Sequence, residues 1–264
     1  GGLFYFLGER AFSGQTPGIA NASINGELIL RSYGTFSHPN VLAGFLLLTL
    51  TLILFNLNFK KTVTSVYVCA IVLGTAALFL TFSRIAIILW ILSIFIFVFS
   101  KVKYNFKYKV LLLLIIILTI LVSFVFYSPF YLRFIHSSFF EDALVLRERL
   151  IVLGVEQFMK NPILGGGINN YFSTVASRGN VFLLQPVHNI FLLTLLQTGI
   201  FGFCYLIWIL YKAFKSVASK KSIYLKLIFF YIILIGLFDH YFLTLQQGQL
   251  LFSYYIGVFL SKDD

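Results

Sequence analysis

Long apolar runs are the feature that most limits how this chain of 264 residues can fold. A helix needs about 20 predominantly apolar residues to cross the hydrocarbon core of a bilayer. Hydrophobic residues make up 59% of the chain and charged residues 11%. A soluble domain carries about 25% charged residues, so that class is excluded. Seven stretches reach or approach the length of a span, at 41–58, 64–81, 85–100, 109–127, 189–211, 223–239 and 246–260.

These runs predict an all-α, polytopic membrane helix bundle of about seven transmembrane helices, GT-C-like, with a long and partly helical loop on one side. Backbone groups inside lipid must bond within their own segment, which favours helices. Lysines are concentrated after the first, third, fifth and seventh runs, and the positive-inside rule assigns those ends to the cytoplasm. The net charge of +11 therefore follows from membrane topology, and we expect no nucleic-acid partner.

This assignment predicts the organisation of the chain. We expect an extracytoplasmic N-terminal segment at 1–40, four spans within 41–127, an extracytoplasmic loop at 128–188, three spans within 189–260 and a cytoplasmic tail at 261–264. Residue 1 is a glycine and the only methionine is Met159, so we expect this sequence to be a fragment or a processed form of a longer chain.

The arginines all fall on the predicted outer side, where positive charge works against the insertion bias. A guanidinium group presents a planar fork of donors that suits bidentate binding of phosphate. We therefore expect at least two of the arginines to bind an anion. They are Arg10, Arg31, Arg84, Arg133, Arg147, Arg149 and Arg178.

The loop at 128–188 contains a predicted helix and a glycine turn. Residues 141–160 are typical of a helix that Asn161-Pro162 ends. Gly165-Gly166-Gly167 predicts a turn whose backbone N–H groups can also approach an anion. The helix has an apolar stripe, which predicts that it lies on the membrane or packs across the mouth of the bundle. The stripe consists of Leu146, Leu150, Leu153 and Phe158.

Histidines stand at the ends of two predicted spans. His188 precedes the fifth span, and its imidazole titrates in the range that suits proton transfer; a structural role at a helix end is the alternative. Asp239 and His240 end the sixth span, where the carboxylate either orients the imidazole or serves with it as an interfacial cap.

Two further observations concern the first span and the absence of metal ligands. We expect Ser37 or Asn40 to cap the first span, with His38 as an interfacial turn residue. Both cysteines lie in apolar runs, and His and carboxylate residues do not cluster at metal-ligand spacing. We therefore predict no metal and no cofactor.

Three motifs in the chain resemble one family of membrane enzymes. Thr81-Phe82-Ser83-Arg84 resembles the T-x-S-R element of the O-antigen ligase and O-antigen polymerase superfamily. Residues 147–172 resemble its stretch of arginine, tryptophan, Asn-Pro and Gly-x-Gly, with Ile151 in place of the usual tryptophan. Residues 187–202 resemble its His-Asn element, with Gln197 in place of the usual acid. Gly34-Thr35-Phe36 through Asn40 and the stretch Asp239–Gln249 also resemble segments of the family, so the resemblance extends over residues 30–264. Family members have more spans than the seven predicted here, which implies that N-terminal helices precede this sequence.

The resemblance implies a lipid-linked glycan transferase of lipopolysaccharide or other cell-envelope polysaccharide biosynthesis. Such an enzyme takes a glycan from undecaprenyl pyrophosphate and transfers it to a glycan, lipid or protein acceptor. It is metal-independent, contacts membrane lipids and acts on the extracytoplasmic face of the cytoplasmic (inner) membrane.

The resemblance also implies the roles of particular residues. The arginines that bind the pyrophosphate correspond to Arg84 and Arg147, and the catalytic histidine corresponds to His188. Arg149 is an alternative to Arg147, because a small shift in the loop alignment exchanges the two. The further candidate ligands of the pyrophosphate or glycan are Arg149, Asn189, Arg31, His38, Asp239 and His240.

Other functions are weighed against a ligase. A polymerase of the same family uses the same donor but another lipid-linked repeat as acceptor. A polytopic transporter or flippase belongs to a different class, and it favours ionisable residues or broken helices at the membrane midplane. The predicted spans carry no internal charge, which argues against an ion-coupled transporter. In a non-enzymatic scaffold, the outward arginines would have no common purpose.

Overall fold

The computed structural model describes residues 20–24, 27–57, 64–101, 138–168, 170 and 185–261, with the single residues 110, 114 and 117. The chain divides into two compact units, one of Gly1–Leu50 with Leu57–Phe139 and one of Thr51–Asn56 with Phe140–Asp264. Several predictions lie outside the described residues. They concern most of the span at 109–127, residues 1–19, the tail after Ser261, and Arg10, Arg133 and Arg178.

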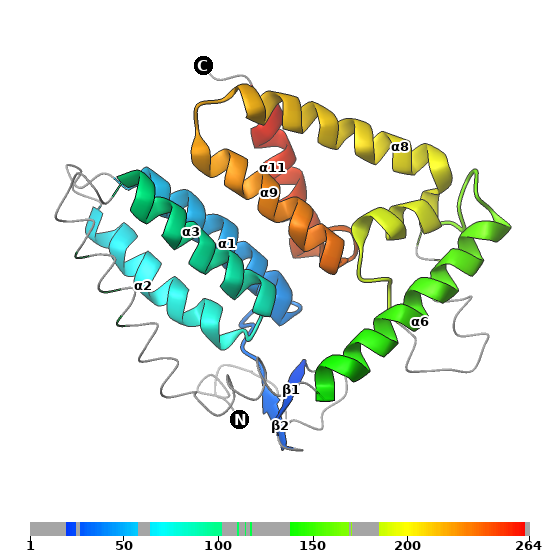
Figure 1. Ribbon diagram of the computed structural model, residues 1–264, viewed down its shortest axis with the longest axis horizontal. Coiled ribbons are helices and arrows are strands. Elements are labelled where there is room, and N and C mark those ends of the chain that lie inside the picture. Colours follow the sequence, from blue (N-terminus) through cyan, green and yellow to red (C-terminus); the bar gives the residue numbers. More distant parts are fainter. Residues whose placement is uncertain are drawn as a thin grey trace. The chain divides into compact units, whose positions relative to one another are not determined.

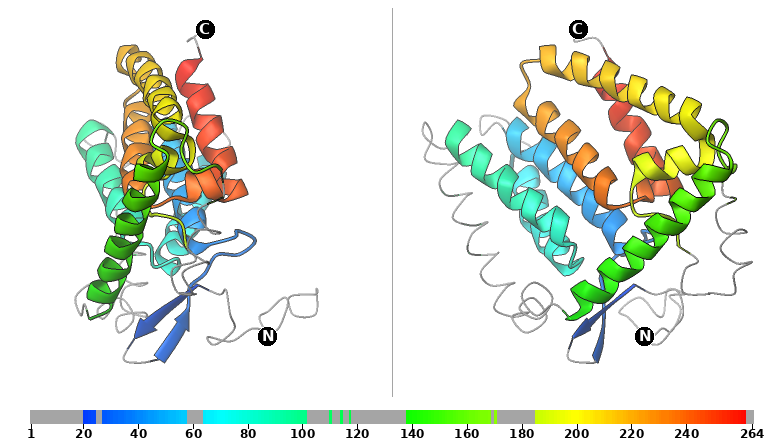
Figure 2. Two further views of the ribbon diagram at one scale, coloured as in Figure 1. Left: turned by 90° about the vertical axis from the view of Figure 1, so that its right-hand side faces the viewer. Right: turned by 45° about the vertical axis from the view of Figure 1, so that its right-hand side comes forward.

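The first unit contains a short hairpin and three apolar helices (Figure 1). The hairpin consists of β1 (Asn21–Ile24) and β2 (Glu27–Leu30). The helices are α1 (Pro39–Asn56, of which the first unit includes residues to Leu50), α2 (Thr64–Leu80) and α3 (Arg84–Lys101). They run side by side in Figures 1 and 2, and they bury Leu47, Leu78 and Trp90 completely.

The antiparallel hairpin was not predicted from the sequence. Ile24 pairs with Glu27, so two residues separate the strands, and in the sequence these are Asn25-Gly26. Asn-Gly between two short runs is a strong sequence signal for a two-residue hairpin. The signal was overlooked because the surrounding segment is rich in small polar residues and has the composition of a loop.

The second unit contains the long loop helix and the C-terminal helices. Its elements are α6 (Ser138–Lys160), α8 (Ile190–Ser219), α9 (Ile223–Phe238), α10 (Tyr241–Thr244) and α11 (Gln246–Leu260). Helices α8, α9 and α11 pack against one another. The described helices occupy six of the seven predicted spans, and α8 continues eight residues beyond the predicted end at 211.

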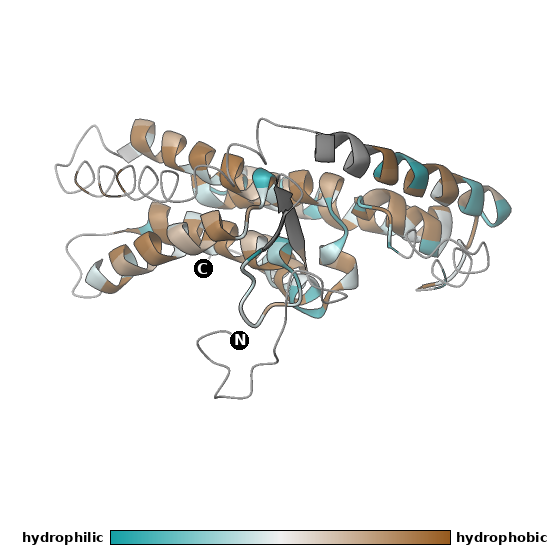
Figure 3. Cartoon of the chain, turned by 90° about the horizontal axis from the view of Figure 1, so that it is seen from below, coloured by the Kyte–Doolittle hydropathy of each residue, from teal (hydrophilic) through white to brown (hydrophobic). Residues whose placement is uncertain are grey.

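Apolar helices pack together within each unit, in agreement with the all-α membrane protein that the sequence predicted. By length and composition, α1 and α8 are long and apolar enough to cross a membrane, whereas the apolar helices α2, α3 and α9 are shorter. Brown, apolar colour dominates most of these helices in Figure 3, and many large apolar side chains are exposed. Exposed apolar surface of this extent is expected of a protein whose surroundings are lipid.

Polar contacts connect helix ends at opposite ends of the second unit. Lys220, which follows α8, donates from Nζ to the carbonyl oxygen of Ser261 at 2.8 Å, just beyond α11. At the other end, Asn189 caps α8 and donates from Nδ2 to the carbonyl oxygen of Leu237 in α9 at 3.2 Å. The lysine-rich connection between α8 and α9 therefore lies at the end of α8 opposite to His188.

Helix α8 is broken at Gly199, where Figure 1 shows it changing direction sharply. Gly199 has φ +65° and ψ −165°, a backbone conformation that only glycine adopts readily. The amide of Ile200 donates to the carbonyl oxygen of Pro162 at 3.0 Å instead of to its own helix. The carbonyl oxygens left over at the break, those of Leu196 and Gln197, accept from the loop at 165–167.

Replacing Gly199 with alanine is expected to destabilise the second unit. A Cβ atom there would overlap the carbonyl group of Ile163 and lie 2.6 Å from the amide nitrogen of Gly165. The backbone conformation alone costs about 1–3 kcal/mol for a non-glycine residue, and the overlap adds to it. Gly257→Ala is the matched control, because a Cβ atom at that helical position meets no atom within 4 Å. Thermal unfolding in detergent should show a lower midpoint for Gly199→Ala only; equal midpoints would contradict this account.

Candidate functional site

The packing of α6 against the start of α8 brings two of the predicted site residues into one unit. The apolar stripe of α6 packs on the N-terminal half of α8, and it is the stripe that the sequence indicated. Its buried centre consists of Leu150, Val187 and Leu196. Arg147 follows Leu146 of that stripe, and His188 follows Val187. The same hydrophobic contact therefore positions both side chains.

The two neighbouring arginines of α6 have different environments. Arg147 is half-buried and its charge acts on the imidazole of His240. Arg149 and the intervening Glu148 are exposed. Because successive residues of a helix are 100° apart, side chains two positions apart point to different sides of the helix. Arg147 is thus the arginine of α6 whose charge acts on His240.

His188 and His240 form a pair of imidazoles in the second unit. Their ring centroids are 4.9 Å apart and their planes make an angle of 71°, an edge-to-face arrangement. His240 is the N-cap residue of the short helix α10, and its Nδ1 lies 2.6 Å from the hydroxyl oxygen of Thr244, four residues later. Asp239 ends α9, and its carboxylate accepts the backbone amide of His240 at 2.7 Å.

The environment of His240 favours a neutral ring. Burial is the largest influence and lowers the pKa of His240 from its ordinary value of 6.5. The carboxylate of Asp239 acts in the opposite direction and raises this pKa, while the charge of Arg147 lowers it. The net effect is a lowered pKa, so near neutral pH the ring carries no charge.

The oxygen and the nitrogen of the Asn189 side-chain amide both make hydrogen bonds within the protein. Its Oδ1 accepts the backbone amide of Leu192 at 2.9 Å and so caps α8, and its Nδ2 binds the carbonyl oxygen of Leu237. The residue that follows His188 therefore holds the start of α8 against the end of α9. Its predicted role as a substrate ligand stays a prediction.

The T-x-S-R element forms the turn between α2 and α3 in the first unit. The hydroxyl of Thr81 donates to the carbonyl oxygen of Leu78 at 2.7 Å, and the hydroxyl oxygen of Thr81 accepts a hydrogen bond from the amide of Ser83 at 3.2 Å. Phe82 is buried with φ +53°, which is uncommon for a non-glycine residue. Arg84 is half-buried and is the first residue of α3, so its guanidinium stands at the positive end of a helix.

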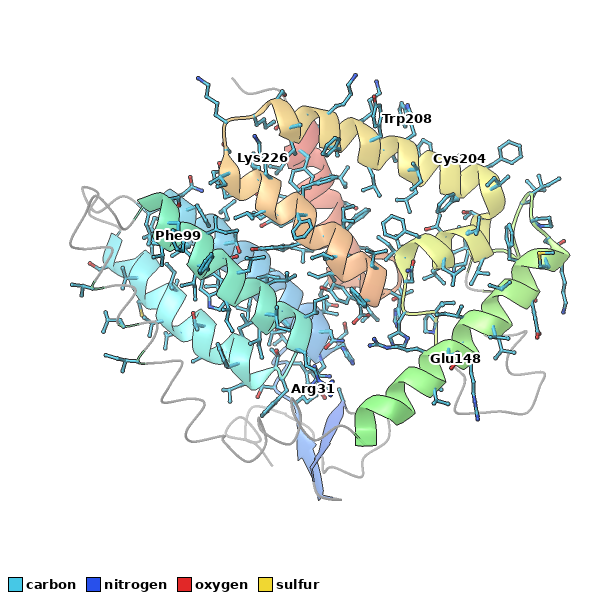
Figure 4. All side chains as sticks on the ribbon, in the orientation of Figure 1. Arg31, Phe99, Glu148, Cys204, Trp208 and Lys226 are labelled. Carbon is cyan, nitrogen blue, oxygen red and sulfur yellow. The ribbon has the colours of Figure 1, made fainter. Side chains whose placement is uncertain are left out.

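Arg31 and Asn40 hold this turn in place. Arg31 is buried where the hairpin joins the helices of the first unit (Figure 4), and its Nε donates to the carbonyl oxygen of Thr81 at 2.8 Å. Its terminal nitrogen donates to Oδ1 of Asn40 at 2.7 Å. At least two of the N–H donors of Arg31 thus bind other residues of the protein, which indicates that Arg31 positions the turn. Its predicted role as an anion ligand remains untested.

The capping of α1 differs from the prediction. His38, rather than Ser37 or Asn40, stands before the first residue of the helix, and its Nδ1 accepts the backbone amide of Asn40 at 3.1 Å. The imidazole ring therefore caps the N-terminus of the helix, a role that Asn and Ser side chains usually have. Asn40 is engaged by Arg31 instead.

The expectation that the glycine turn can cradle an anion is wrong. The amides of Gly165, Gly166 and Gly167 donate to the carbonyl oxygens of Asn161, Leu196 and Gln197, at 2.9, 2.8 and 3.0 Å. These donors are therefore used inside the protein. The sequence did not reveal their partners, because the break in α8 that leaves two of those carbonyls open depends on tertiary structure.

Thr244 is a site residue that the sequence analysis missed. It contacts His240, and the signal was its spacing, because residues four apart lie on one face of a helix. That spacing was obscured because α10 is only four residues long.

A comparison with known protein families shows which family the chain belongs to. Residues 69–207 match the model described as O-antigen ligase, a range that includes Arg84, Arg147, His188 and the glycines at the break in α8. The match covers more than half of the 264 residues, and the chain belongs to the O-antigen ligase family. It is a membrane-associated protein of the glycan ligase or polymerase type, with a glycosyltransferase-like activity. No curated protein and no solved structure gave a match.

The lowered pKa of His240 predicts how stability depends on pH. Below about pH 6.5 the unfolded chain binds a proton at this residue, whereas the folded protein does so only at lower pH. Stability should therefore decrease as the pH falls from 6.5 toward the lowered pKa of the folded state, and this contribution levels off below it. We expect the unfolding midpoint in detergent to decrease less between about pH 7.5 and 5.5 in His240→Asn than in the wild type. Parallel curves for the two proteins would contradict the prediction.

Proposed function

We propose that the protein transfers a glycan from undecaprenyl pyrophosphate to an acceptor hydroxyl on the outer face of the cytoplasmic membrane. The observation that carries the proposal is the cluster of Arg147, His188 and His240 in a member of the O-antigen ligase family. A guanidinium supplies a phosphate ligand, and an imidazole supplies a proton acceptor. The acceptor is a lipid, a glycan or a protein.

The reaction replaces one bond at the anomeric carbon with another. The acceptor oxygen bonds to that carbon while the bond from the carbon to the pyrophosphate oxygen breaks. The pyrophosphate leaves with the electron pair, and the acceptor hydroxyl gives its proton to His188. Negative charge thus develops on the leaving phosphate, where positioned guanidinium groups lower the barrier.

Arg147 and Arg84 are the proposed ligands of the pyrophosphate. Arg147 is supported by its partial burial and by its charge, which acts on the neighbouring imidazole. Arg84 is supported by its place at the first turn of α3, where the helix dipole adds to the attraction of an anion. Residues farther from the reaction, such as Arg31, Asn189 and Asp239, would position these groups or contact the glycan.

The helix ends of the second unit support the proposed membrane orientation. The connection at 212–226 is rich in lysine and lies at the opposite end of α8 from His188. By the positive-inside rule, positive charge favours the cytoplasmic side for the lysine-rich end of α8, which leaves the end beside His188 for the outer face. In this arrangement the polyprenyl tail of the donor lies among the apolar helices while its head group reaches the cluster.

Reconstitution tests the function directly. The full chain in nanodiscs would receive an oligosaccharide linked to undecaprenyl pyrophosphate, with a defined acceptor and without nucleotide sugar. Release of undecaprenyl pyrophosphate together with a glycosylated acceptor, both measured by mass spectrometry, supports the ligase. Chain extension with the donor alone identifies the polymerase alternative. Movement of intact donor across proteoliposomes without bond exchange would support a flippase and overturn the proposal.

Arg84→Lys is expected to lose most of the transfer activity without loss of expression. A lysine keeps the charge but cannot offer two parallel donors to a phosphate. We expect a decrease of about 100-fold in kcat, similar to the loss of one donor to a developing oxyanion. Steady-state transfer rates in nanodiscs measure it. Full activity would remove Arg84 from the mechanism.

The adjacent arginines of α6 provide a matched comparison. Arg147→Lys should decrease transfer by about 100-fold, whereas Arg149→Lys should change it by less than about threefold, because only Arg147 acts on the histidine cluster. Both variants keep the charge and helix propensity of α6, so differences in folding are small. If Arg149→Lys is the more damaging change, the assignment of the two residues is reversed.

A further inference from the structure

The neutral imidazole beside His188 has no role in the reaction as proposed so far. His240 lies outside the range 69–207 that matches the family model, yet its ring meets that of His188 edge to face at 4.9 Å. The rings come from different parts of the chain, since His188 precedes α8 and His240 precedes α10. A contact that closes between separate elements can set the orientation of both rings.

Thr244 determines which nitrogen of His240 carries the proton. Its hydroxyl donates to the backbone carbonyl oxygen of His240 at 3.2 Å and lies 2.6 Å from the Nδ1 of the same residue. A hydroxyl has one proton to donate, so both contacts are hydrogen bonds only if Nδ1 is the donor in the second. His240 is then the Nδ1–H tautomer, with its lone pair on Nε2.

Burial and the nearby charges together keep the ring of His240 neutral. Arg147 of α6 opposes a second positive charge, Asp239 favours it, and α11 contributes no charged side chain along Gln246–Leu260. Tyr241, next along the chain, stays a neutral phenol because burial raises its pKa. Two cationic rings at this spacing would repel each other, so a positive charge on one ring disfavours a positive charge on the other. With His240 buried and neutral, the proton taken from the acceptor belongs to His188.

We infer that His240 is a positioning residue for His188: Thr244 fixes its tautomer, and its neutral ring holds the imidazole of His188 in the orientation that transfer requires. This inference rests on the proposed function, in which His188 accepts the proton of the acceptor hydroxyl. Thr244 does not contact the reacting groups in this scheme. It binds and orients the ring of His240, which in turn orients the base His188, as a third group orients the base in other enzymes.

Nitrogen NMR of the histidines tests the inference without any substrate. The chain has four histidines, so ¹⁵N-histidine labelling of the full protein in nanodiscs gives few signals. We expect His240 to show the neutral Nδ1–H tautomer from about pH 7 to 8, above the ordinary pKa of histidine. In Thr244→Val this tautomer should be lost and the signals of His188 should shift, while Thr244→Ser should restore both. A cationic or Nε2–H ring at His240, or unchanged His188 signals in Thr244→Val, would overturn the inference.

Transfer kinetics provide the second readout. Thr244→Val, which is close to isosteric, should decrease kcat about tenfold with KM unchanged, because a small misorientation of the base affects the reaction and not the binding of the donor. Thr244→Ser should recover most of the rate, and wild-type kcat in Thr244→Val would overturn the positioning role. If the wild type transfers no glycan, the proposed function fails, whereas the NMR result still decides whether Thr244 and His240 orient His188.

Discussion

The hydrogen bonds at the break in α8 are the constraint on which the second unit depends. Gly199 interrupts the helix, and the carbonyl oxygens of Leu196 and Gln197 would be left without donors. The loop after α6 supplies them from Gly166 and Gly167, and the carbonyl oxygen of Pro162 accepts the amide of Ile200 in return. An unbonded backbone group away from water is costly, so this exchange fastens the end of α6 to α8. The two glycine-containing motifs of the family are therefore one structural unit.

The consequence of this attachment reaches the chemistry. Once the end of α6 is fixed, its apolar stripe can lie on the first half of α8, and Arg147 comes near the imidazoles. The first unit uses the same principle at the turn before Arg84. There the carbonyl oxygen of Thr81 accepts a hydrogen bond from the buried Arg31. In both units, helix ends beside a proposed phosphate ligand are stabilised by partners that are distant in the sequence.

Much of the bundle could be predicted because it rests on local properties. The apolar runs indicated where helices lie, and the stripe of α6 indicated its buried face. The hairpin was missed although Asn25-Gly26 signalled it, and Ser37 or Asn40 was expected at the cap that His38 provides. The glycine turn was misinterpreted as a place for an anion. Each of these errors concerns a hydrogen-bond partner, and partners are set by contacts between segments.

The sequence by itself determined that this is an apolar helical bundle with lysines and arginines segregated along the chain, because run length and charge position are properties of the chain alone. Only the tertiary structure decided that Arg147 rather than Arg149 acts on His240, and that the ring of His240 contacts His188 on one side and Thr244 at its Nδ1. These choices depend on the direction in which α6 faces and on how α10 meets the start of α8. Both follow from long-range packing, which periodicity along a sequence does not specify.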